Sequence, residues 1–325
     1  MKPDGNFPQA TCKEQREHVV VRNERNGSRQ KIKMKIVFQG EPGANSHIAC
    51  KQAYPDAEPV PCPTFEDAFA MIEDGKADLG MIPIENSVAG RVADIHHLLP
   101  TSPLHITGEH FLPIHHQLVA LKGVTLDQVK SAQSHVMALG QCRKFLREHR
   151  LEAVIGADTA GSARQIAERN DPAQAAIASA LAAEVYGLDV LAGDIEDEDH
   201  NTTRFITLAC EPISLAPGNG PVVTAFIFRV RNVSAALFKA LSGFATNSVN
   251  MTKLESYQTG GQFFASQFYA EIDGHPDDKH VALAMEELEF FSAELRILGT
   301  FAAHPYRAYI LEPEENRALR PSPGV

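Results

Sequence analysis

From residue 35 onward the chain alternates short apolar runs with helical segments, and this alternation constrains the fold more than any other feature. Apolar runs of strand length stand at 35–38, 77–84, 152–156 and 174–179. The segment 64–75 predicts a helix with Thr64 as its N-cap and Gly75 as its terminator. Strands that alternate with helices predict an α/β fold with a largely parallel sheet covered by helices.

Two longer segments and one loop refine this pattern. Residues 104–121 predict either two strands or one long strand broken at Pro113. Residues 134–149 have the apolar spacing of a helix. The loop after the first strand offers Ser46 as a helix cap.

The composition changes at residues 211–221, which are rich in Pro and Gly and predict a linker. Beyond the linker we expect a strand at 222–230, a helix at 234–247, two strands, a second helix and a final strand. That order is the ferredoxin-like arrangement. The sequence therefore predicts a main α/β part and a smaller C-terminal part.

Charge and composition exclude several classes of protein. The net charge of −11 argues against a nucleic-acid-binding surface. No window approaches the roughly 18 apolar residues of a membrane span, and the N-terminus lacks the apolar core of a signal peptide. The five cysteines are scattered without CxxC spacing, so we expect neither a disulfide framework nor a zinc site, and we expect a reducing cytoplasm. Residues 1–33 are polar and predict a flexible extension, with Met34 as an alternative start.

Polar clusters of the main part fall where predicted strands pass into loops or helices, which is where ligands bind in open α/β sheets. They stand at 39–47, 83–91, 134–135 with 141–142, 156–162 and 200–205. Ser87, Ser134 and Thr159 mark expected helix N-termini, whose backbone N–H groups suit a carboxylate or phosphate. Taken singly, each of the three is more simply interpreted as an N-cap.

Common cofactor and metal motifs are missing from the sequence. It contains neither GxGxxG nor GxxxxGK[ST], so we expect no dinucleotide loop and no P-loop. The pairs His96–His97 and His115–His116 are direct neighbours whose side chains point different ways, so neither predicts a metal site. The acidic run 194–199 is better explained as a solvated loop than as a cation site.

The stretch HNTTRF at 200–205 opens an apolar strand with polar side chains. Because side chains alternate along a strand, we expect Thr203 and Phe205 to face one way and Arg204 the other. On these residues alone, a strand edge and an active site are evenly matched.

Five separated motifs carry a resemblance to a known family. HNTTRF, PIENSVAGRV (83–92), SHVMALGQC (134–142) and DTAGSAR (158–164) closely resemble prephenate dehydratase. The C-terminal unit, with NMTKLES at 250–256, resembles the ACT regulatory domain of that family. The resemblance runs from about residue 35 to about 311 and is to the stand-alone bacterial type, since no chorismate mutase segment precedes residue 34.

The resemblance implies a two-lobed catalytic domain, similar to type 2 periplasmic binding proteins, with its site in the cleft between the lobes. The implied boundaries are 1–33 for the extension, 34–211 for the catalytic domain (lobe one 35–112 and 195–210, lobe two 113–194), 212–220 for the linker, 221–311 for the ACT domain with its α+β ferredoxin-like fold and 312–325 for the tail.

The resemblance also implies the reaction, which is conversion of prephenate to phenylpyruvate with loss of CO2 and water in L-phenylalanine biosynthesis. No metal and no organic cofactor is implied. Thr203 matches the proposed proton donor, and Arg204 is expected to hold a substrate carboxylate or to shape the local field. The residues expected to line the pocket are Asn86, Ser87, Ser134, Gln141, Thr159, Ala160, Asn201 and Phe205.

The implied regulator is L-phenylalanine, bound by the ACT domains at an interface of a homodimer or homotetramer. The residues expected to bind it are Ala235, Leu237, Asn247, Asn250, Leu254, Glu255 and Ser256. Ala235 and Ser248 stand where the family has Gly, which permits a tight turn or a close approach of the ligand. These departures leave the strength of feedback inhibition open.

Two alternatives stay open at this point. Arogenate differs from prephenate by an amino group in place of the keto oxygen, and no residue decides between these substrates. A non-catalytic binder of small molecules shares the two-lobed fold, although an intact Thr203–Arg204–Phe205 argues for an enzyme.

Overall fold

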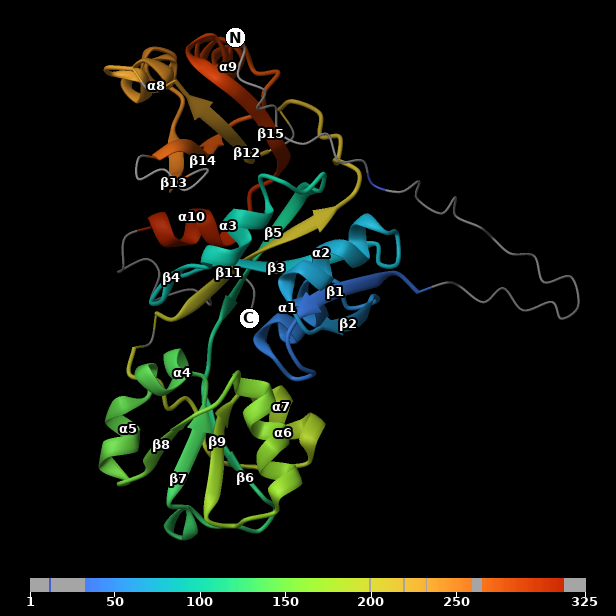
Figure 1. Ribbon diagram of the computed structural model, residues 1–325, viewed down its shortest axis with the longest axis vertical. Helices are drawn as coiled ribbons and strands as arrows, with labels where there is room; N and C mark the ends of the chain where they lie inside the picture. The colour runs from blue at the N-terminus through green and yellow to red at the C-terminus, as the bar shows by residue number, and fades with distance from the viewer. Residues whose placement is uncertain are drawn as a thin grey trace, which may run out of the picture.

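The computed structural model describes residue 12 and residues 33–198, 200–218, 220–231, 233–258 and 265–312. Three β-sheets follow one another along the long axis in Figure 1, and we call them the lower, middle and upper sheets. The predicted extension 1–33 and tail 312–325 lie almost entirely outside the described residues. Within the described residues, no helix is long and apolar enough to cross a membrane.

The middle sheet has the strand order β2-β1-β3-β11-β5, with β4 paired to β3. Its strands are β1 (Lys35–Gln39), β2 (Glu58–Cys62), β3 (Leu79–Asn86), β4 (Gly90–Arg91), β5 (His105–Pro113) and β11 (Thr202–Ala209). Its helices are α1 (Asn45–Ala53), α2 (Phe65–Glu73) and α3 (Ala93–Leu98). β1 runs parallel to β2 and β3, whereas β11 runs antiparallel to β3 and β5.

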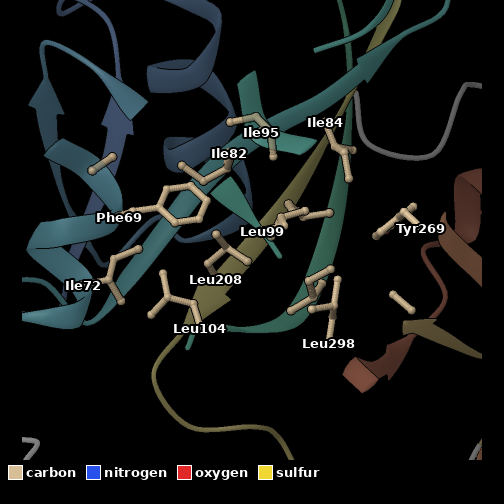
Figure 2. Close-up of a cluster of buried hydrophobic side chains, with 14 of the residues drawn as sticks. Phe69, Ile72, Ile82, Ile84, Ile95, Leu99, Leu104, Leu208, Tyr269 and Leu298 are labelled. Carbon is tan, nitrogen blue, oxygen red and sulfur yellow. The ribbon is translucent and has the colours of Figure 1, made fainter. Parts of the chain in front are cut away.

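The helix predicted at 64–75 is α2, and its N-terminus is capped as expected. Thr64 Oγ1 accepts a hydrogen bond from the Asp67 backbone N–H at 3.1 Å. The apolar side of α2 brings Phe69 and Ile72 into one buried cluster with Ile82 of β3 (Figure 2). Burying an apolar side chain of this size contributes about 1.5–3 kcal/mol, so the apolar spacing decides which side of the helix meets the sheet.

The lower sheet has the strand order β10-β6-β9-β7-β8. Its strands are β6 (Gln117–Ala120), β7 (Ser131–Ser134), β8 (Glu152–Ile155), β9 (Gln174–Ala178) and β10 (Asp189–Ala192). Its helices are the 3₁₀ helix η1 (Leu126–Gln128), α4 (Val136–Gln141), α5 (Arg143–Glu148), α6 (Thr159–Arg169) and α7 (Ala180–Tyr186). β7 is parallel to β8 and β9, whereas β6 is antiparallel to β9 and β10.

The prediction of a largely parallel sheet is wrong, because both of these sheets are mixed. The chain leaves the middle sheet along β5, enters the lower sheet as β6 and returns along β11. Strands that carry the chain out and back must run in opposite directions, and β5 and β11 are accordingly antiparallel. The predicted α/β class itself is confirmed.

The chain crosses between the middle and lower sheets twice. β5 ends at Pro113 and β6 begins at Gln117, so the predicted break at Pro113 is confirmed. The two crossing segments are hydrogen-bonded to each other. Ile114 N–H donates to the Asn201 carbonyl at 2.8 Å, and Ile195 N–H donates to the His116 carbonyl at 3.0 Å.

Two local predictions differ from the structure. The single helix expected at 134–149 is two short helices, α4 and α5, which meet at Cys142. Cys142 has φ −120° and ψ 26°, which lie outside the helical region, so the helix breaks at this residue. Its thiol is buried in the core at the break. Ser46 does not cap α1, because that helix already begins at Asn45, after Ala44.

The upper sheet has the strand order β13-β14-β12-β15, and its elements follow the predicted ferredoxin-like sequence. They are β12 (Val222–Val230), α8 (Ala236–Thr246), β13 (Met251–Gln258), β14 (Ala265–Asp273), α9 (Lys279–Phe291) and β15 (Ser292–Ala302), followed by α10 (Pro305–Leu311). Along β12, Phe226 and Phe228 pack with α8 and α9, whereas Val223 and Ile227 join the core of the middle sheet. Burial on both faces explains the unbroken apolar run of β12.

The upper sheet is fixed directly on the middle sheet. A Cβ atom on Gly299 of β15 would lie 1.9 Å from the carbonyl oxygen of Ile106 in β5, so glycine permits this approach of the two strands. Figure 2 shows Tyr269 and Leu298 of the upper sheet in the same buried cluster as Leu208 of β11. The predicted linker is thus one of several connections between the two parts.

A disulfide joins Cys12 to Cys210, at the end of β11. The expectation of no disulfide is therefore wrong for this pair. The two cysteines are 198 residues apart, so no local spacing could have indicated the bond. Cys50, Cys62 and Cys142 are free and buried.

Ala235 and Ser248, at which the resemblance leads us to expect glycine, both have left-handed backbone conformations. Their φ angles are +60° and +55°. Ala235 is the N-cap of α8, and Ser248 follows the C-cap of the same helix. The left-handed region costs a non-glycine residue roughly 1–2 kcal/mol, so both positions carry backbone strain.

Ala235→Gly and Ser248→Gly should each raise the free energy of unfolding by about 0.5–1 kcal/mol, because relief of the strain exceeds the added entropy of the unfolded chain. Urea unfolding measures the change. The matched control is Ala245→Gly on the exposed side of α8, which should lower the free energy of unfolding by about the same amount. Equal destabilisation by all three changes would show that the left-handed positions are unstrained.

Candidate functional site

The candidate site is centred on Thr203, the second residue of β11. Thr203 is paired with Asn86 of β3 and with Leu112 of β5. Asn86 Nδ2 donates to Thr203 Oγ1 at 2.9 Å and to Asn201 Oδ1 at 2.8 Å. Since the oxygen of Thr203 accepts this hydrogen bond, its own hydroxyl proton is not used toward Asn86.

The orientation of the Asn86 amide is fixed by the turn that follows β3. Its Oδ1 accepts hydrogen bonds from the backbone N–H groups of Val88 at 3.0 Å and Ala89 at 2.7 Å. A backbone N–H can only donate, so the group that faces Thr203 must be the NH2 group. Asn86 is therefore held as a donor toward Thr203.

Ser87 ties the same turn to the start of β11. Its hydroxyl donates to the His200 carbonyl at 2.7 Å and accepts from the Thr202 backbone N–H at 2.9 Å. No helix begins at Ser87, since α3 starts at Ala93 after an uncapped Val92. The expected helix N-terminus at Ser87 is wrong, and its side chain holds the loop that presents Thr203.

Residues of the lower part complete this arrangement. Asn201 Nδ2 donates to Gln141 Oε1 at 3.1 Å, and His116 Nε2 lies 2.8 Å from the same oxygen. Because an amide oxygen only accepts, His116 carries its proton on Nε2. Burial is the main reason that the pKa of His116 lies below its usual value, so the ring is neutral near pH 7. Hydrogen bonds thus lead from Thr203 through Asn86, Asn201 and Gln141 to His116, and they join the two crossing segments.

Four predicted site residues are therefore brought together, namely Thr203, Asn86, Asn201 and Gln141. Three others are sealed from solvent, namely Ser134 and Ala160 at 0% exposure and Phe205 at 1%. Ser134 Oγ donates to the Ile177 carbonyl at 2.6 Å, so its hydroxyl serves the lower sheet. Phe205, which the sequence predicts to line the pocket, packs in a buried cluster with Phe38 and Leu112.

The helix N-terminus expected at Thr159 is present, since α6 begins at that residue, but a carboxylate already caps this helix end. Asp158 is the N-cap of α6, and its Oδ1 accepts from the Gly161 N–H at 2.6 Å. A substrate carboxylate there would meet a charge of its own sign. Ser134 likewise precedes α4, whose N-cap is His135.

Arg204 faces away from Thr203, as the alternation along the strand predicts. Its guanidinium is 4% exposed and binds three glutamates. Its Nε donates to Glu109 Oε2 at 2.8 Å, and one terminal nitrogen donates to Glu85 at 3.0 Å and to Glu271 at 2.8 Å. The expectation that Arg204 holds a substrate carboxylate is therefore corrected, since protein carboxylates take that place.

Arg204 belongs to a larger group, which we call the ion cluster and define as Glu85, Glu109, Glu271, Arg204, Lys253 and Arg307. Arg307 of α10 donates to Glu109 Oε1 at 2.7 Å and to Glu271 Oε2 at 2.7 Å. Lys253 of β13 pairs with Glu85. The three acids and three bases balance in charge, and the cluster joins the middle sheet to the upper one. No sequence spacing connects its members.

Electrostatics keep the ion cluster charged despite burial. Burial would raise the pKa of Glu271, but the charges of Arg204 and Arg307 lower it to about 2. Burial also opposes the charge on Arg204, yet Glu271 and Glu109 hold its pKa well above the usual value. Removal of one member would leave an uncompensated buried charge, which is strongly destabilising.

The residues expected to bind the regulator lie around α8 and β13. Ala235 and Leu237 lie at the start of α8, and Asn247 is its C-cap. Asn250 Nδ2 donates to Asp273 Oδ2 at 2.7 Å. The remaining three, Leu254, Glu255 and Ser256, are consecutive residues of β13.

One group of described residues has the composition of a cation site. His115, Asp194 and Glu196 place ligand atoms within 4.8 Å of one another at the crossing. His115 Nδ1 lies 2.8 Å from Glu196 and 3.4 Å from Asp194, so the three already pair with each other. Exposed acidic groups of this kind are common without a metal ion, and we assign none.

A cavity of about 600 Å³ lies elsewhere, lined by Gln52, Tyr54, His110, Thr207 and His304 among others. None of its lining residues belongs to the predicted site.

Comparison with known proteins places the chain in a family. The sequence profile of the family described as "Prephenate dehydratase" matches residues 36–213. A "Bifunctional N-acyl-homoserine lactone acylase/prephenate dehydratase" of Komagataeibacter europaeus is 46% identical, over 84% of this chain and 97% of its own. "Arogenate dehydratase/prephenate dehydratase 2, chloroplastic" of Arabidopsis thaliana is 38% identical, over 85% of this chain and 74% of its own.

Solved structures give the same picture. A protein described as a novel type of quorum quenching acylase superposes with a TM-score of 0.80 at 46% identity, over 84% of this chain and 99% of its own. Prephenate dehydratase of Arthrobacter aurescens in complex with L-Phe has a TM-score of 0.76 at 35% identity, over 83% of this chain and 90% of its own. The family expected from the sequence motifs is confirmed.

The electrostatics of Glu271 predict a specific response to acid. Its pKa of about 2 lies below the ordinary 4.5, so between these values the unfolded chain binds more protons than the folded chain. The stabilisation by the charged carboxylate is complete above pH 4.5 and is lost as the pH falls toward 2. Urea unfolding across this window should give a falling free energy of unfolding.

Glu271→Gln should flatten that part of the pH profile, because the amide does not titrate. The matched control is Glu294→Gln, which removes a glutamate paired with Arg229 inside the upper sheet. If Glu271→Gln leaves the slope below pH 4.5 unchanged, Glu271 is not responsible for it.

Proposed function

Because this chain belongs to the prephenate dehydratase family, we propose that it converts prephenate to phenylpyruvate, CO2 and water, with Thr203 as the proton donor. The observation that carries the proposal is the hydrogen bond from Asn86 Nδ2 to Thr203 Oγ1. It leaves the hydroxyl proton of Thr203 free for the substrate.

The chemistry asks little of the protein beyond orientation and one proton. The bond between the ring and its carboxylate breaks, its electron pair enters the ring, and the ring hydroxyl departs on the opposite side as the ring becomes aromatic. Hydroxide is strongly basic as it leaves, so a neutral threonine hydroxyl can protonate it in the transition state. The step is redox-neutral, so the proposal assigns no cofactor and no metal.

Asn86 has a second role in this scheme. When Thr203 gives up its proton, negative charge develops on Oγ1, and the Asn86 N–H group already points at that oxygen. A donor placed before the reaction stabilises developing charge without reorganisation. Water then returns the proton to Thr203.

Thr203→Ala should lower kcat with prephenate by about 10²-fold or more, the usual scale for loss of a positioned proton donor. Formation of phenylpyruvate is followed by its absorbance in alkali. Thr203→Ser retains the hydroxyl and should keep most of the activity. Asn86→Asp should resemble Thr203→Ala, because the carboxylate would accept the proton of Thr203 instead of donating to its oxygen.

The matched control is Thr202→Ala, since Thr202 is the neighbouring threonine and is also partly exposed. Its Oγ1 lies 3.3 Å from the hydroxyl of Tyr306, away from Asn86. Thr202→Ala should lower kcat by at most about three-fold, the scale of one hydrogen bond of modest strength, and should stay far more active than Thr203→Ala. If the two alanine variants lose activity equally, Thr203 is not the donor.

Arogenate is the second substrate to assay, because relatives of this chain are named as prephenate dehydratases, arogenate dehydratases or both. Parallel assays with the two substrates decide between them through the ratio of their kcat/KM values.

A second candidate activity is hydrolysis of N-acyl-homoserine lactones. It is favoured by the 46% identical relative from Komagataeibacter europaeus, which is named for both activities. Release of homoserine lactone by the purified protein measures it, and Thr203→Ala shows whether the two activities share a site.

The regulator is proposed to be L-phenylalanine, which is bound by the 35% identical relative from Arthrobacter aurescens. Ala235 and Asn247 lie at opposite ends of α8, roughly 18 Å apart. One phenylalanine is too short to reach both ends within one chain. We therefore place each ligand between two copies of the chain, in a homodimer or homotetramer, with Phe238 at 76% and Phe290 at 74% exposure as apolar surface on the helices of the upper sheet.

L-Phenylalanine should raise the melting temperature and lower turnover, because it binds the folded assembly and not the unfolded chain. D-Phenylalanine is the control and should do neither. If the L-form changes neither quantity, Ala235 and Ser248 have disabled the site.

A further inference from the structure

We propose that Glu271 of β14 is a positioning residue for Thr203, acting through Arg204, so that the upper sheet sets the rate of the reaction. The effect on rate rests on the proposed function, whereas the positioning itself is a structural property. Glu271 lies in the upper sheet, and the hydrogen bonds of its side chain go to Arg204, Tyr269 and Arg307.

The connection between Arg204 and Thr203 rests on two adjacent residue pairs of β3 and β11. Thr203 is opposite Asn86 and Arg204 is opposite Glu85 in the register of these strands. Asn86 holds Thr203 at 2.9 Å on one side, while Glu85 holds Arg204 at 3.0 Å on the other. Thr203 and Arg204 share a peptide bond, so the partners of Arg204 restrain the backbone that carries Thr203.

A register shift follows directly after this point. The pairing of β11 with β3 slips between Arg204 and Phe205. Regular ladder contacts therefore do not continue through the peptide after Arg204 on that side, and side-chain contacts gain importance in fixing the strand. The strongest of them are the charged hydrogen bonds of Arg204.

Glu271 is the member of the ion cluster that brings the upper sheet to Arg204. One of its oxygens accepts from Arg204 at 2.8 Å and from the Tyr269 hydroxyl at 2.5 Å, and the other accepts from Arg307 at 2.7 Å. Its side chain is 0% exposed, so water does not replace these contacts. Loss of its charge would leave Arg204 with two acidic partners and Arg307 with one, and would let Arg204 move.

The helix α10 holds the other side of Thr203. Its Tyr306 hydroxyl lies 3.3 Å from Thr202 Oγ1, and its ring stacks on Phe111 of β5 at 4.8 Å. Arg307 of the same helix binds Glu271. The residues before and after Thr203 are thus both held by segments that follow the linker.

The candidate regulator residues are close to this network in sequence. Leu254 and Glu255 of β13 directly follow Lys253, which pairs with Glu85. A ligand that shifts β13 would act on Lys253, then on Glu85, and then on its neighbour Asn86. The ion cluster thereby provides a physical connection between the upper sheet and the hydroxyl of Thr203.

The test uses full-length protein with Glu271→Gln, and Glu294→Gln as the matched control. Both changes replace a glutamate paired with arginine in the upper sheet, but Glu294 pairs with Arg229 of β12. Glu271→Gln should lower kcat about 10-fold with KM within about two-fold, because a small displacement of a reacting group costs this much in turnover. Glu294→Gln should leave both constants unchanged.

A double variant separates positioning from general damage. In Thr203→Ala the donor is gone, so adding Glu271→Gln should not lower kcat further. An equal loss of kcat in the two backgrounds would overturn the proposal, and so would a Glu271→Gln enzyme with unchanged kcat.

A measurement that does not depend on turnover separates this proposal from the proposed function. The methyl resonance of Thr203, assigned by its loss in Thr203→Ala, should shift in Glu271→Gln and stay in place in Glu294→Gln. If the unchanged protein makes no phenylpyruvate, the proposed function fails while this signal still decides the positioning. If the Thr203 methyl group has the same chemical shift in Glu271→Gln and in Glu294→Gln, the positioning role of Glu271 is overturned.

If Glu271→Gln does not fold, Tyr269→Phe replaces it, because it removes one hydrogen bond to Glu271 and retains the ring. It should shift the same methyl resonance and lower kcat about three-fold, the scale of one hydrogen bond of modest strength. An unmoved resonance with unchanged kcat would contradict the positioning role.

Discussion

The buried guanidinium of Arg204 is the contact on which the arrangement of this protein depends. Three carboxylates from β3, β5 and β14 meet it, so one side chain joins strands of the middle sheet to the upper sheet. A buried charge is tolerated only with such partners, because each charge loses its hydration. Every element that supplies a partner is therefore held in place by the same requirement, and the strand that carries Thr203 lies at its centre.

The same strand has two chemically different faces. Thr203 accepts a hydrogen bond from the neutral amide of Asn86, which also donates to Asn201, whereas Arg204 contacts fixed charges. Neutral groups suit a hydroxyl that must release a proton, and charged groups suit a rigid connection between sheets. His116 of one crossing segment and Gln141 of α4 continue these contacts, so the hydroxyl is also linked to the lower part of the molecule.

Much of the fold was predictable because its signals are local. The cap of Thr64, the break at Pro113 and the order of helices and strands along the chain after residue 221 all depend on neighbours in sequence, and the structure confirms them. The mixed sheets were not predictable, since the direction of β11 follows from the return of the chain. The strand β7 was missed because its four residues, SAQS, contain no apolar run.

The sequence by itself determined the family, the alternation of elements and the opposite orientation of Thr203 and Arg204, because motifs and side-chain period are properties of consecutive residues. Only the tertiary structure decided what each side chain meets. It turned Arg204 from an expected ligand for substrate into a link to Glu271, 67 residues away, and it occupied the expected anion site of α6 with Asp158. Partners of buried charges come from distant segments, and their identity is fixed only when the sheets pack together.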